Sequence, residues 1–208
     1  MKLLLRAAAV AFAAGFTASA VAQDQAATPP AETPTKVFAG AGLGGGFGAR
    51  TKVNGQTSSF DDRFQGTTDK TSLVAVNVAS FGIAFKPGLY AGIDLSGFAQ
   101  SGRQPNGDKT TLQITNYFGA LTYFPWETGL FLRAGAGLSS FVATTGSSSE
   151  HSGGLGILVA AGYALQLSGS HHLTLTVEQS WQSYGGSSAT KPDSSQIGGV
   201  FLGYMWKP

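Results

Sequence analysis

Hydrophobic side chains alternate with glycine or small polar residues near the end of the chain, in segment 196–206. Successive side chains of a β-strand point to opposite faces, so this alternation predicts a strand with one large apolar face. The bulky set consists of Val200, Leu202, Tyr204 and Trp206. The other set is interrupted by Gly199 and Gly203, so the two faces differ strongly in size.

Seven earlier segments repeat this alternation: 37–49, 73–85, 89–96, 111–124, 130–139, 154–166 and 173–182. Segment 111–124 is less regular, because its bulky residues share a face with Asn116 and Thr122. Strands whose bulky face meets lipid show this pattern. The sequence therefore predicts an all-β fold, a closed eight-stranded antiparallel transmembrane up-and-down barrel. The last strand would pair with the first and leave no open edge.

Glycine occupies one set of alternate positions in the first segment, from Gly40 to Gly48. Glycine normally weakens a strand, so a flexible loop is the alternative interpretation. A narrow barrel favours the strand instead, because its crowded lumen must be filled by small side chains on some strands.

The connections between the predicted strands alternate between long and short. Polar segments 51–70, 101–110, 144–153 and 185–195 are predicted as loops, whereas 86–88, 125–129 and 168–172 are predicted as turns. Outer-membrane barrels have short periplasmic turns and longer external loops, so both termini are predicted to be periplasmic. Aromatic residues near strand ends are predicted to form interfacial girdles: Phe85, Tyr123, Phe124, Trp126, Trp181, Tyr204 and Trp206.

The N-terminus predicts a secretory signal peptide over residues 1–22. Lys2 and Arg6 precede a short apolar run and small residues suited to cleavage after Ala22. The alternative is an uncleaved anchor. Residues 23–35 contain three prolines and are predicted to be a disordered periplasmic leader. Residues 36–208 then form the barrel domain.

Composition narrows the class of protein. Charged residues make up 12% of the chain, against about 25% in soluble proteins. No run of about 20 apolar residues follows the N-terminus, which excludes a helical membrane protein. Without Lys2 and Arg6, the 13 basic residues fall to 11 and match the 11 acidic ones, so a nucleic-acid partner is not expected. The lack of cysteine excludes disulfides, thiolate metal sites and a lipidated N-terminal cysteine.

Three ionisable residues lie within predicted strands: Asp94, Arg133 and Glu178. All three fall on the glycine and polar face, at similar distances from the predicted periplasmic turns. Charges inside a membrane protein are costly and usually pair. We therefore predict a lumen charge cluster in which the Arg133 guanidinium bridges both carboxylates. It would act as a structural plug or, alternatively, as a gate or proton path.

Two other groups of residues suggest chemistry only weakly. Glu150, His151 and Ser152 have the residue types of a hydrolytic triad, but neighbours in an extended chain point apart. His171 and His172 offer weak metal ligands, although a solvated turn is the simpler interpretation. We therefore predict no catalytic, cofactor-binding or metal-binding residues, no cofactor and no enzyme activity.

From Val37 to Trp206 the chain resembles the small outer-membrane barrels of the OmpA/OmpX type in Gram-negative bacteria. The resemblance rests on the signal peptide, the eight glycine-punctuated strands and the final Tyr204 and Trp206. It implies that Tyr204 and Trp206 serve as an assembly signal, read by the outer-membrane assembly machinery. Lys207 and Pro208 depart from this family pattern because they follow the terminal aromatic residue.

The expected function is that of a monomeric structural or interaction barrel in the outer membrane of the cell envelope. Its lumen would be filled by side chains, and its loops would be exposed at the surface. The expected partners are membrane lipid, lipopolysaccharide, the assembly machinery and surface ligands at the loops. The alternatives are a narrow, porin-like pore for small solutes, a lipid-modifying outer-membrane enzyme, and a soluble ligand-binding barrel.

Overall fold

A computed structural model describes residues 36–126, 129–185 and 191–208. The predicted signal peptide and leader lie outside the described residues. The strands are β1 (Val37–Val53), β2 (Gln56–Ser59), β3 (Val74–Lys86), β4 (Leu89–Arg103), β5 (Lys109–Tyr123), β6 (Gly129–Thr145), β7 (Ser148–Ser168), β8 (His171–Tyr184) and β9 (Ser194–Trp206). A short 3-10 helix, η1 (Asp61–Phe64), follows β2. No helix in the described part of the chain is long and apolar enough to cross a membrane.

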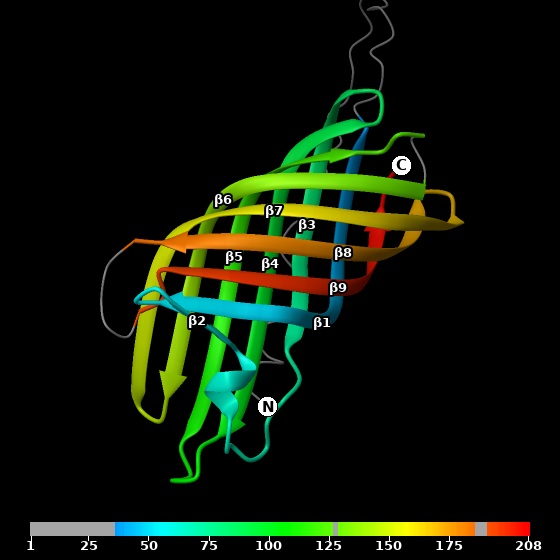
Figure 1. Ribbon diagram of the computed structural model, residues 1–208. Coiled ribbons are helices and arrows are strands. Elements are labelled where there is room, and N and C mark those ends of the chain that lie inside the picture. Colours follow the sequence, from blue (N-terminus) through cyan, green and yellow to red (C-terminus); the bar gives the residue numbers. More distant parts are fainter. Residues whose placement is uncertain (1–35, 127–128, 186–190) are drawn as a thin grey trace, which may run out of the picture. The chain divides into compact units, whose positions relative to one another are not determined.

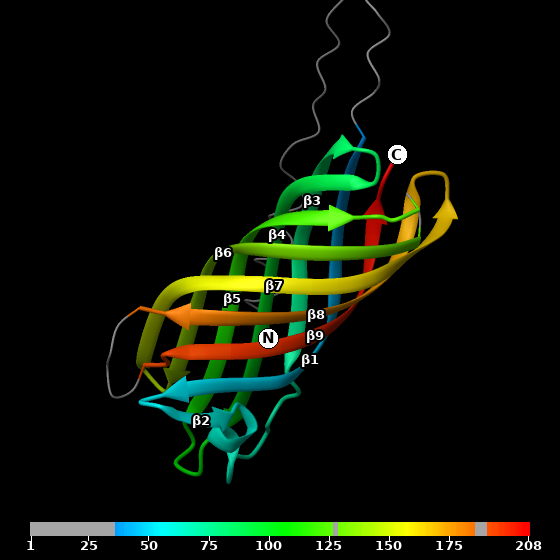
Figure 2. The ribbon, with the colours of Figure 1, turned by 45° about the horizontal axis from the view of Figure 1, so that its top comes forward.

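Eight of the strands close into an antiparallel ring, which confirms the predicted barrel (Figure 1). Each strand from β3 to β9 pairs with its neighbour in sequence, and β1 pairs with β3 on one side and β9 on the other. At the closure, Leu43 of β1 lies opposite Leu202 of β9. Figure 2 shows β1 and β9 side by side. The strand β2 extends the sheet beyond β1 and is not part of the ring.

The alternation of side chains agrees with the predicted faces. On β9, Leu202 is 59% exposed whereas its neighbour Phe201 is 3% exposed. Similar outward residues continue around the ring and form an apolar belt that includes Leu43, Ile93, Leu132, Val159, Leu175 and Leu202. A continuous outward belt of this kind is typical of strands that face lipid.

The strand β5 departs from this pattern. Its bulky residues Leu112, Ile114 and Phe118 are buried, and Tyr117 and Leu121 face outward. The larger apolar set of this strand therefore fills the lumen.

Glycines on the inner face allow the close packing that the sequence predicted. A Cβ at Gly44 would lie 1.7 Å from the carbonyl oxygen of Val200 on the next strand. A Cβ at Gly82 would lie 2.4 Å from the ring of Phe38. Since real Cβ contacts do not approach this closely, the first glycine permits strand contact and the second makes room for a lumen aromatic ring.

Two predicted loops contain strand residues. Half of segment 101–110 belongs to the end of β4 and the start of β5, which leave residues 104–108 as the connection. Segment 144–153 contains a two-residue turn between β6 and β7, at Gly146 and Ser147. Beyond the apolar belt both faces of these strands are polar, so the hydrogen-bonded ladder continues without the hydrophobic alternation that reveals it in the sequence.

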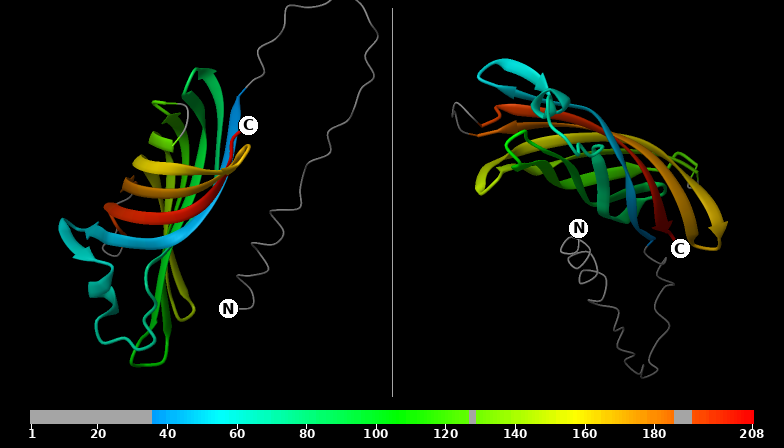
Figure 3. Two further views of the ribbon diagram at one scale, coloured as in Figure 1. Left: turned by 90° about the vertical axis from the view of Figure 1, so that its right-hand side faces the viewer. Right: turned by 90° about the horizontal axis from the view of Figure 1, so that it is seen from below.

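The predicted loop 51–70 is also structured. After Gly45, β1 separates from β3 and later pairs with β2 through a tight turn at Asn54 and Gly55. We call residues 56–67, which comprise β2, η1 and the following turn, the cap. Figure 3 shows this segment leaving the end of β1 and returning toward β3. Phe60 and Phe64 of the cap are buried, so the prediction of an exposed polar loop is wrong here.

Candidate functional site

The lumen contains a polar layer between two apolar clusters. We call the end of the ring where β1 begins and β9 ends the terminal end, and the opposite end the tip end. At the terminal end, a buried cluster consists of Phe38, Tyr90, Phe124, Phe131, Ala164 and Met205. Contrary to the prediction of an outer girdle position, Phe124 therefore fills the lumen. The other predicted girdle residues at this end, such as Tyr204 and Trp206, are exposed.

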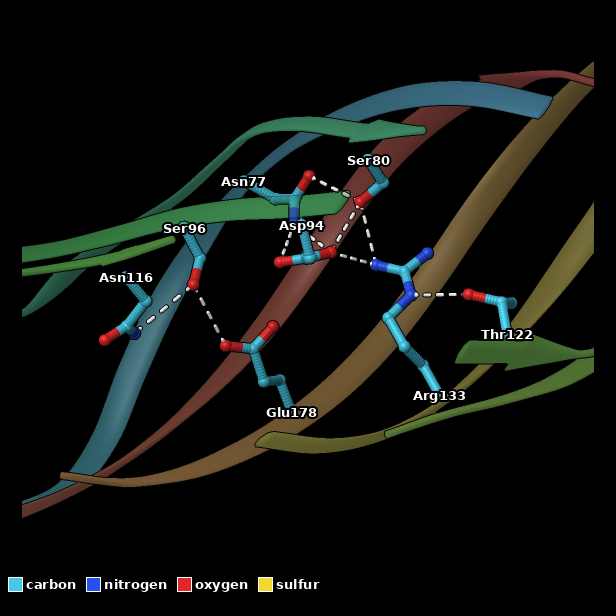
Figure 4. Close-up of polar contacts among 8 residues, drawn as sticks. All are labelled: Asn77, Ser80, Asp94, Ser96, Asn116, Thr122, Arg133 and Glu178. Carbon is cyan, nitrogen blue, oxygen red and sulfur yellow. Dashed lines mark hydrogen bonds and ion pairs between the residues drawn. The ribbon is translucent and has the colours of Figure 1, made fainter. Parts of the chain in front are cut away.

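Asp94 lies at the centre of the polar layer and is fully buried (Figure 4). Both of its oxygens accept hydrogen bonds from Asn77 Nδ2, each at 3.1 Å. Ser80 Oγ donates to Oδ2 at 2.7 Å, and Arg133 Nη1 forms an ion pair with the same oxygen. The buried carboxylate is thus paired and hydrogen-bonded, as a charge removed from water requires.

Arg133 is held on this side of the lumen by three kinds of contact. Its Nη1 also donates to Ser80 Oγ at 2.8 Å, and its Nε donates to Thr122 Oγ1 at 3.1 Å. The guanidinium carbon lies 5.8 Å and 5.6 Å from the ring centroids of Phe38 and Phe131. These cation–π contacts join the charged layer to the terminal-end cluster.

Glu178 is equally buried but does not contact Arg133. Its Oε1 accepts a hydrogen bond from Ser96 Oγ at 3.2 Å. Among the ion pairs of the described residues, Arg133 is joined to Asp94 and not to Glu178. The predicted bridge between Arg133 and both acids is therefore wrong, because Thr122 and the two aromatic rings hold the guanidinium beside Asp94. A cavity of about 20 Å³ borders both Arg133 and Glu178, which is room for about one water molecule.

A second set of polar side chains extends from Glu178 toward the tip end. Asn116 Nδ2 donates to Ser96 at 3.4 Å, and Asn116 Oδ1 accepts from Ser139 at 2.7 Å. Gln182 Nε2 also donates to Asn116, at 3.4 Å. These residues were not predicted as members of the charge cluster. Their inward phase along each strand was the available signal, but uncharged polar residues are common on such faces.

The cap closes the tip end of the lumen. Phe60 and Phe64 pack in a buried cluster with residues of β4, β5, β6 and β9, and the Phe60 ring contacts Phe141 at a centroid distance of 6.3 Å. Polar contacts hold η1 in place: Ser59 N donates to Asp62 at 2.7 Å, Gln100 donates to Asp61 at 3.1 Å, and Lys70 pairs with Asp61 at 2.6 Å.

The remaining candidate residues that are adjacent in sequence lie on opposite faces of their strands. His151 is exposed and contacts Ser149, whereas its neighbour Ser152 is buried on the opposite face of β7. His171 contacts the hydroxyl of Tyr204, and His172 is buried near the Ser170 carbonyl, so His172 is not part of a solvated turn. Among the described residues, no group of three or more His, Cys, Asp or Glu side chains could hold a metal ion.

No protein-family model matches the sequence, and the comparison with curated proteins found no match. Similar folds occur among solved structures. Neisserial surface protein A (NspA) has a TM-score of 0.49 and 14% identity, over 85% of this chain and 98% of that chain. The attachment invasion locus protein Ail of Yersinia pestis, solved with the heparin analogue sucrose octasulfate, has a TM-score of 0.48 and 11% identity, over 85% of this chain and 100% of that chain.

The outer-membrane protein OprG from Pseudomonas aeruginosa has a TM-score of 0.44 and 13% identity, over 84% of this chain and 95% of that chain. These neighbours are small outer-membrane β-barrels. At these identities the likeness concerns the fold and not the activity.

Proposed function

We propose that the protein is an outer-membrane β-barrel with a sealed lumen, which inserts into the bilayer and presents its tip end to the outside. In this role the barrel is a structural support, and the cap and strand tips provide an interaction surface. The outward apolar belt supports the membrane location. The closed ring supports it as well, because its backbone hydrogen bonds are satisfied within the sheet, as a bilayer requires.

The filled lumen is the observation that favours this function over that of a pore. The terminal-end cluster, the charged layer and the cap close the lumen at three successive levels. The cavity within the charged layer has a volume of about 20 Å³, which is too small for a hydrated solute. Eight-stranded barrels are narrow enough for side chains to fill them in this way.

The proposed orientation places both ends of the barrel domain in the periplasm. Tyr204 and Trp206 would then be available to the assembly machinery while β9 pairs with β1. Arg50 and Lys52 are exposed on β1 beyond Phe47 of the apolar belt, where the phosphates of lipopolysaccharide would meet cationic side chains. The protein is proposed to act as a monomer.

Planar-bilayer recording tests the sealed lumen. We expect the refolded protein to show no steady conductance, in samples whose folding is verified by heat-modifiable mobility on gels. Stable single-channel steps from the wild-type chain would overturn the proposal in favour of a narrow pore.

Surface labelling of intact cells tests the orientation. An epitope inserted after Asn106, in the connection between β4 and β5, should be accessible to antibody on intact cells. The same epitope placed after Pro208 should become accessible only after the outer membrane is permeabilised. The reverse result would contradict the proposed orientation.

A further inference from the structure

A cavity of about 520 Å³ lies at the tip end, between the cap and the ends of β5, β6 and β7. We call it the tip cup. Its apolar lining comes from Val53, Leu112 and Ala143, and Leu112 is also part of the buried cluster below the cap. The volume lies within the range of about 300–1,000 Å³ that is usual for small-molecule sites.

Two opposite charges line this cavity. Arg63 comes from η1 in the cap, and Glu150 comes from β7, where it shares the inward phase of the buried Ser152. Burial lowers the pKa of the Arg63 guanidinium, and the charge of Glu150 opposes that shift. The two side chains therefore interact electrostatically, yet no ion pair within 4.0 Å joins these two described residues.

Uncharged polar side chains that line the tip cup form hydrogen bonds with one another, whereas the described side chains of Arg63 and Glu150 are not joined by an ion pair. Gln104 Nε2 donates to Thr110 Oγ1 at 3.1 Å, and Thr110 lies 3.2 Å from the hydroxyl of Thr145. These contacts join the ends of β4, β5 and β6 and fix that wall. The charged groups that face the open space are thus Arg63 and Glu150, above an apolar lining.

We propose that the tip cup binds a small zwitterionic molecule with an apolar body. Its anionic group would pair with Arg63, its cationic group with Glu150, and its apolar body would rest on Leu112 and Ala143. Each charged pair would be partly shielded from water by the cavity walls, which strengthens it relative to a pair in open solvent. This inference rests on the proposed function only in placing the tip cup at the cell surface.

A set of four probes tests each recognised feature. The probes are L-phenylalanine, phenylpropanoate without the amine, phenylethylamine without the carboxylate, and glycine without the apolar body. Saturation-transfer NMR on the refolded protein in phosphatidylcholine nanodiscs measures binding, and empty nanodiscs correct for partitioning. We expect L-phenylalanine to bind most tightly, with each incomplete probe weaker by about tenfold or more.

Charge variants assign the binding to the two residues. Arg63→Gln should lower the affinity for L-phenylalanine to that for phenylethylamine, which lacks the carboxylate. Glu150→Gln should lower it to that for phenylpropanoate, which lacks the amine. Lys109→Gln and Asp69→Asn remove the same charges elsewhere at the tip end, do not line the cavity, and should leave binding unchanged. The double variant Arg63→Glu with Glu150→Arg should restore binding that either reversal alone abolishes, because a zwitterion can turn round.

The inference is overturned if wild-type protein does not bind L-phenylalanine, or if the charge variants bind it as the wild type does. If nanodisc samples show heat-modifiable mobility but no binding, the protein is folded and only the proposed ligand binding at the tip cup is contradicted. The epitope experiment tests the surface location separately, so the proposed function would stand in that case.

Discussion

At the scale of single residues, the lumen shows how a narrow β-barrel accommodates buried charge. Asp94 has a full set of donors from Asn77, Ser80 and Arg133. The planar guanidinium of Arg133 can pair with a carboxylate while its faces contact aromatic rings, which a lysine ammonium cannot do with the same geometry. The charged layer is therefore specific for arginine at this position.

Replacement of Arg133 by alanine should destabilise the barrel by about 3–5 kcal/mol, the scale for breaking a buried pair from one side. The reason is that Asp94 would stay buried without its cation. Equilibrium unfolding of refolded protein in liposomes measures the change.

The double variant Arg133→Met with Asp94→Asn should cost clearly less, because no unpaired charge remains and the introduced amide would keep partners in Asn77 and Ser80. Lys86→Ala, at an exposed turn, should have little effect. A double variant as unstable as Arg133→Ala would show that packing, and not charge, dominates this layer.

The two faces of β7 provide a second residue-scale prediction. Val159→Arg places a charge in the middle of the outward belt and should cost about 2–4 kcal/mol if this face meets lipid. His151→Arg lies on the same face of the same strand but beyond the belt, and should be nearly neutral. Liposome unfolding compares the two variants, and equal costs would contradict the position of the belt.

At the scale of elements, the sequence predicts those strands in which hydrophobic and small or polar residues alternate. All eight ring strands, and the inward position of Asp94, Arg133 and Glu178, follow from period-two patterns in the belt. The polar ends of β4 to β7 were predicted as loops because neither face there is apolar. The buried role of Phe60 and Phe64 was missed because the two aromatics stand four residues apart among polar neighbours, and their partners lie on distant strands.

That Arg133 contacts Asp94 and not Glu178 could not be predicted from the strand pattern either. The sequence places three charges on one face, but it does not specify which carboxylate the guanidinium reaches. Thr122 and the aromatic rings of Phe38 and Phe131 decide this in three dimensions.

The cap should dock in a pH-dependent manner. The hydrogen bond from Lys70, followed by that from Gln100, lowers the pKa of Asp61, and both partners lie outside the cap. A carboxyl pKa that is lower in the docked state stabilises docking above the ordinary value near 4. That stabilisation is lost as the pH falls through the lowered pKa of Asp61.

A spin label at Thr67→Cys, a half-buried position of the cap beside Gly102 of β4, would measure this, since the chain has no other cysteine. We expect a less mobile label at pH 6 than at a pH below the lowered pKa of Asp61. Asp61→Asn should remove the pH response, and Phe64→Ala should mobilise the label at both values. A label of unchanged mobility throughout would show that Asp61 does not control docking.

At the scale of the whole molecule, closure of the ring joins the first and last strands. Leu43 and Leu202 lie directly opposite each other across the β1–β9 pair, and Leu175 lies opposite Leu202 on the other side. The closed sheet thus makes residues 159 positions apart immediate neighbours.

Cysteine cross-linking tests this closure. Leu43→Cys with Leu202→Cys should form a disulfide on oxidation of the folded protein, because paired strands bring Cα atoms within the usual range of about 4.4–6.8 Å. Leu43→Cys with Leu175→Cys places the cysteines two strands apart, about 10 Å, and should not react. Equal reaction of both pairs would contradict the register.

The last contact of the chain has a consequence for the order of folding. Lys207 follows β9, and its Nζ lies 4.3 Å from the ring centroid of Phe124, which comes from the connection after β5. Its backbone N–H also donates to Ser170, before β8. These partners come from two separate connections, so the lysine can reach its position only when the strands between them are already aligned. We therefore expect the contacts of Lys207 to form only after the strands between these two connections have aligned, which would make them a marker of a completely folded barrel.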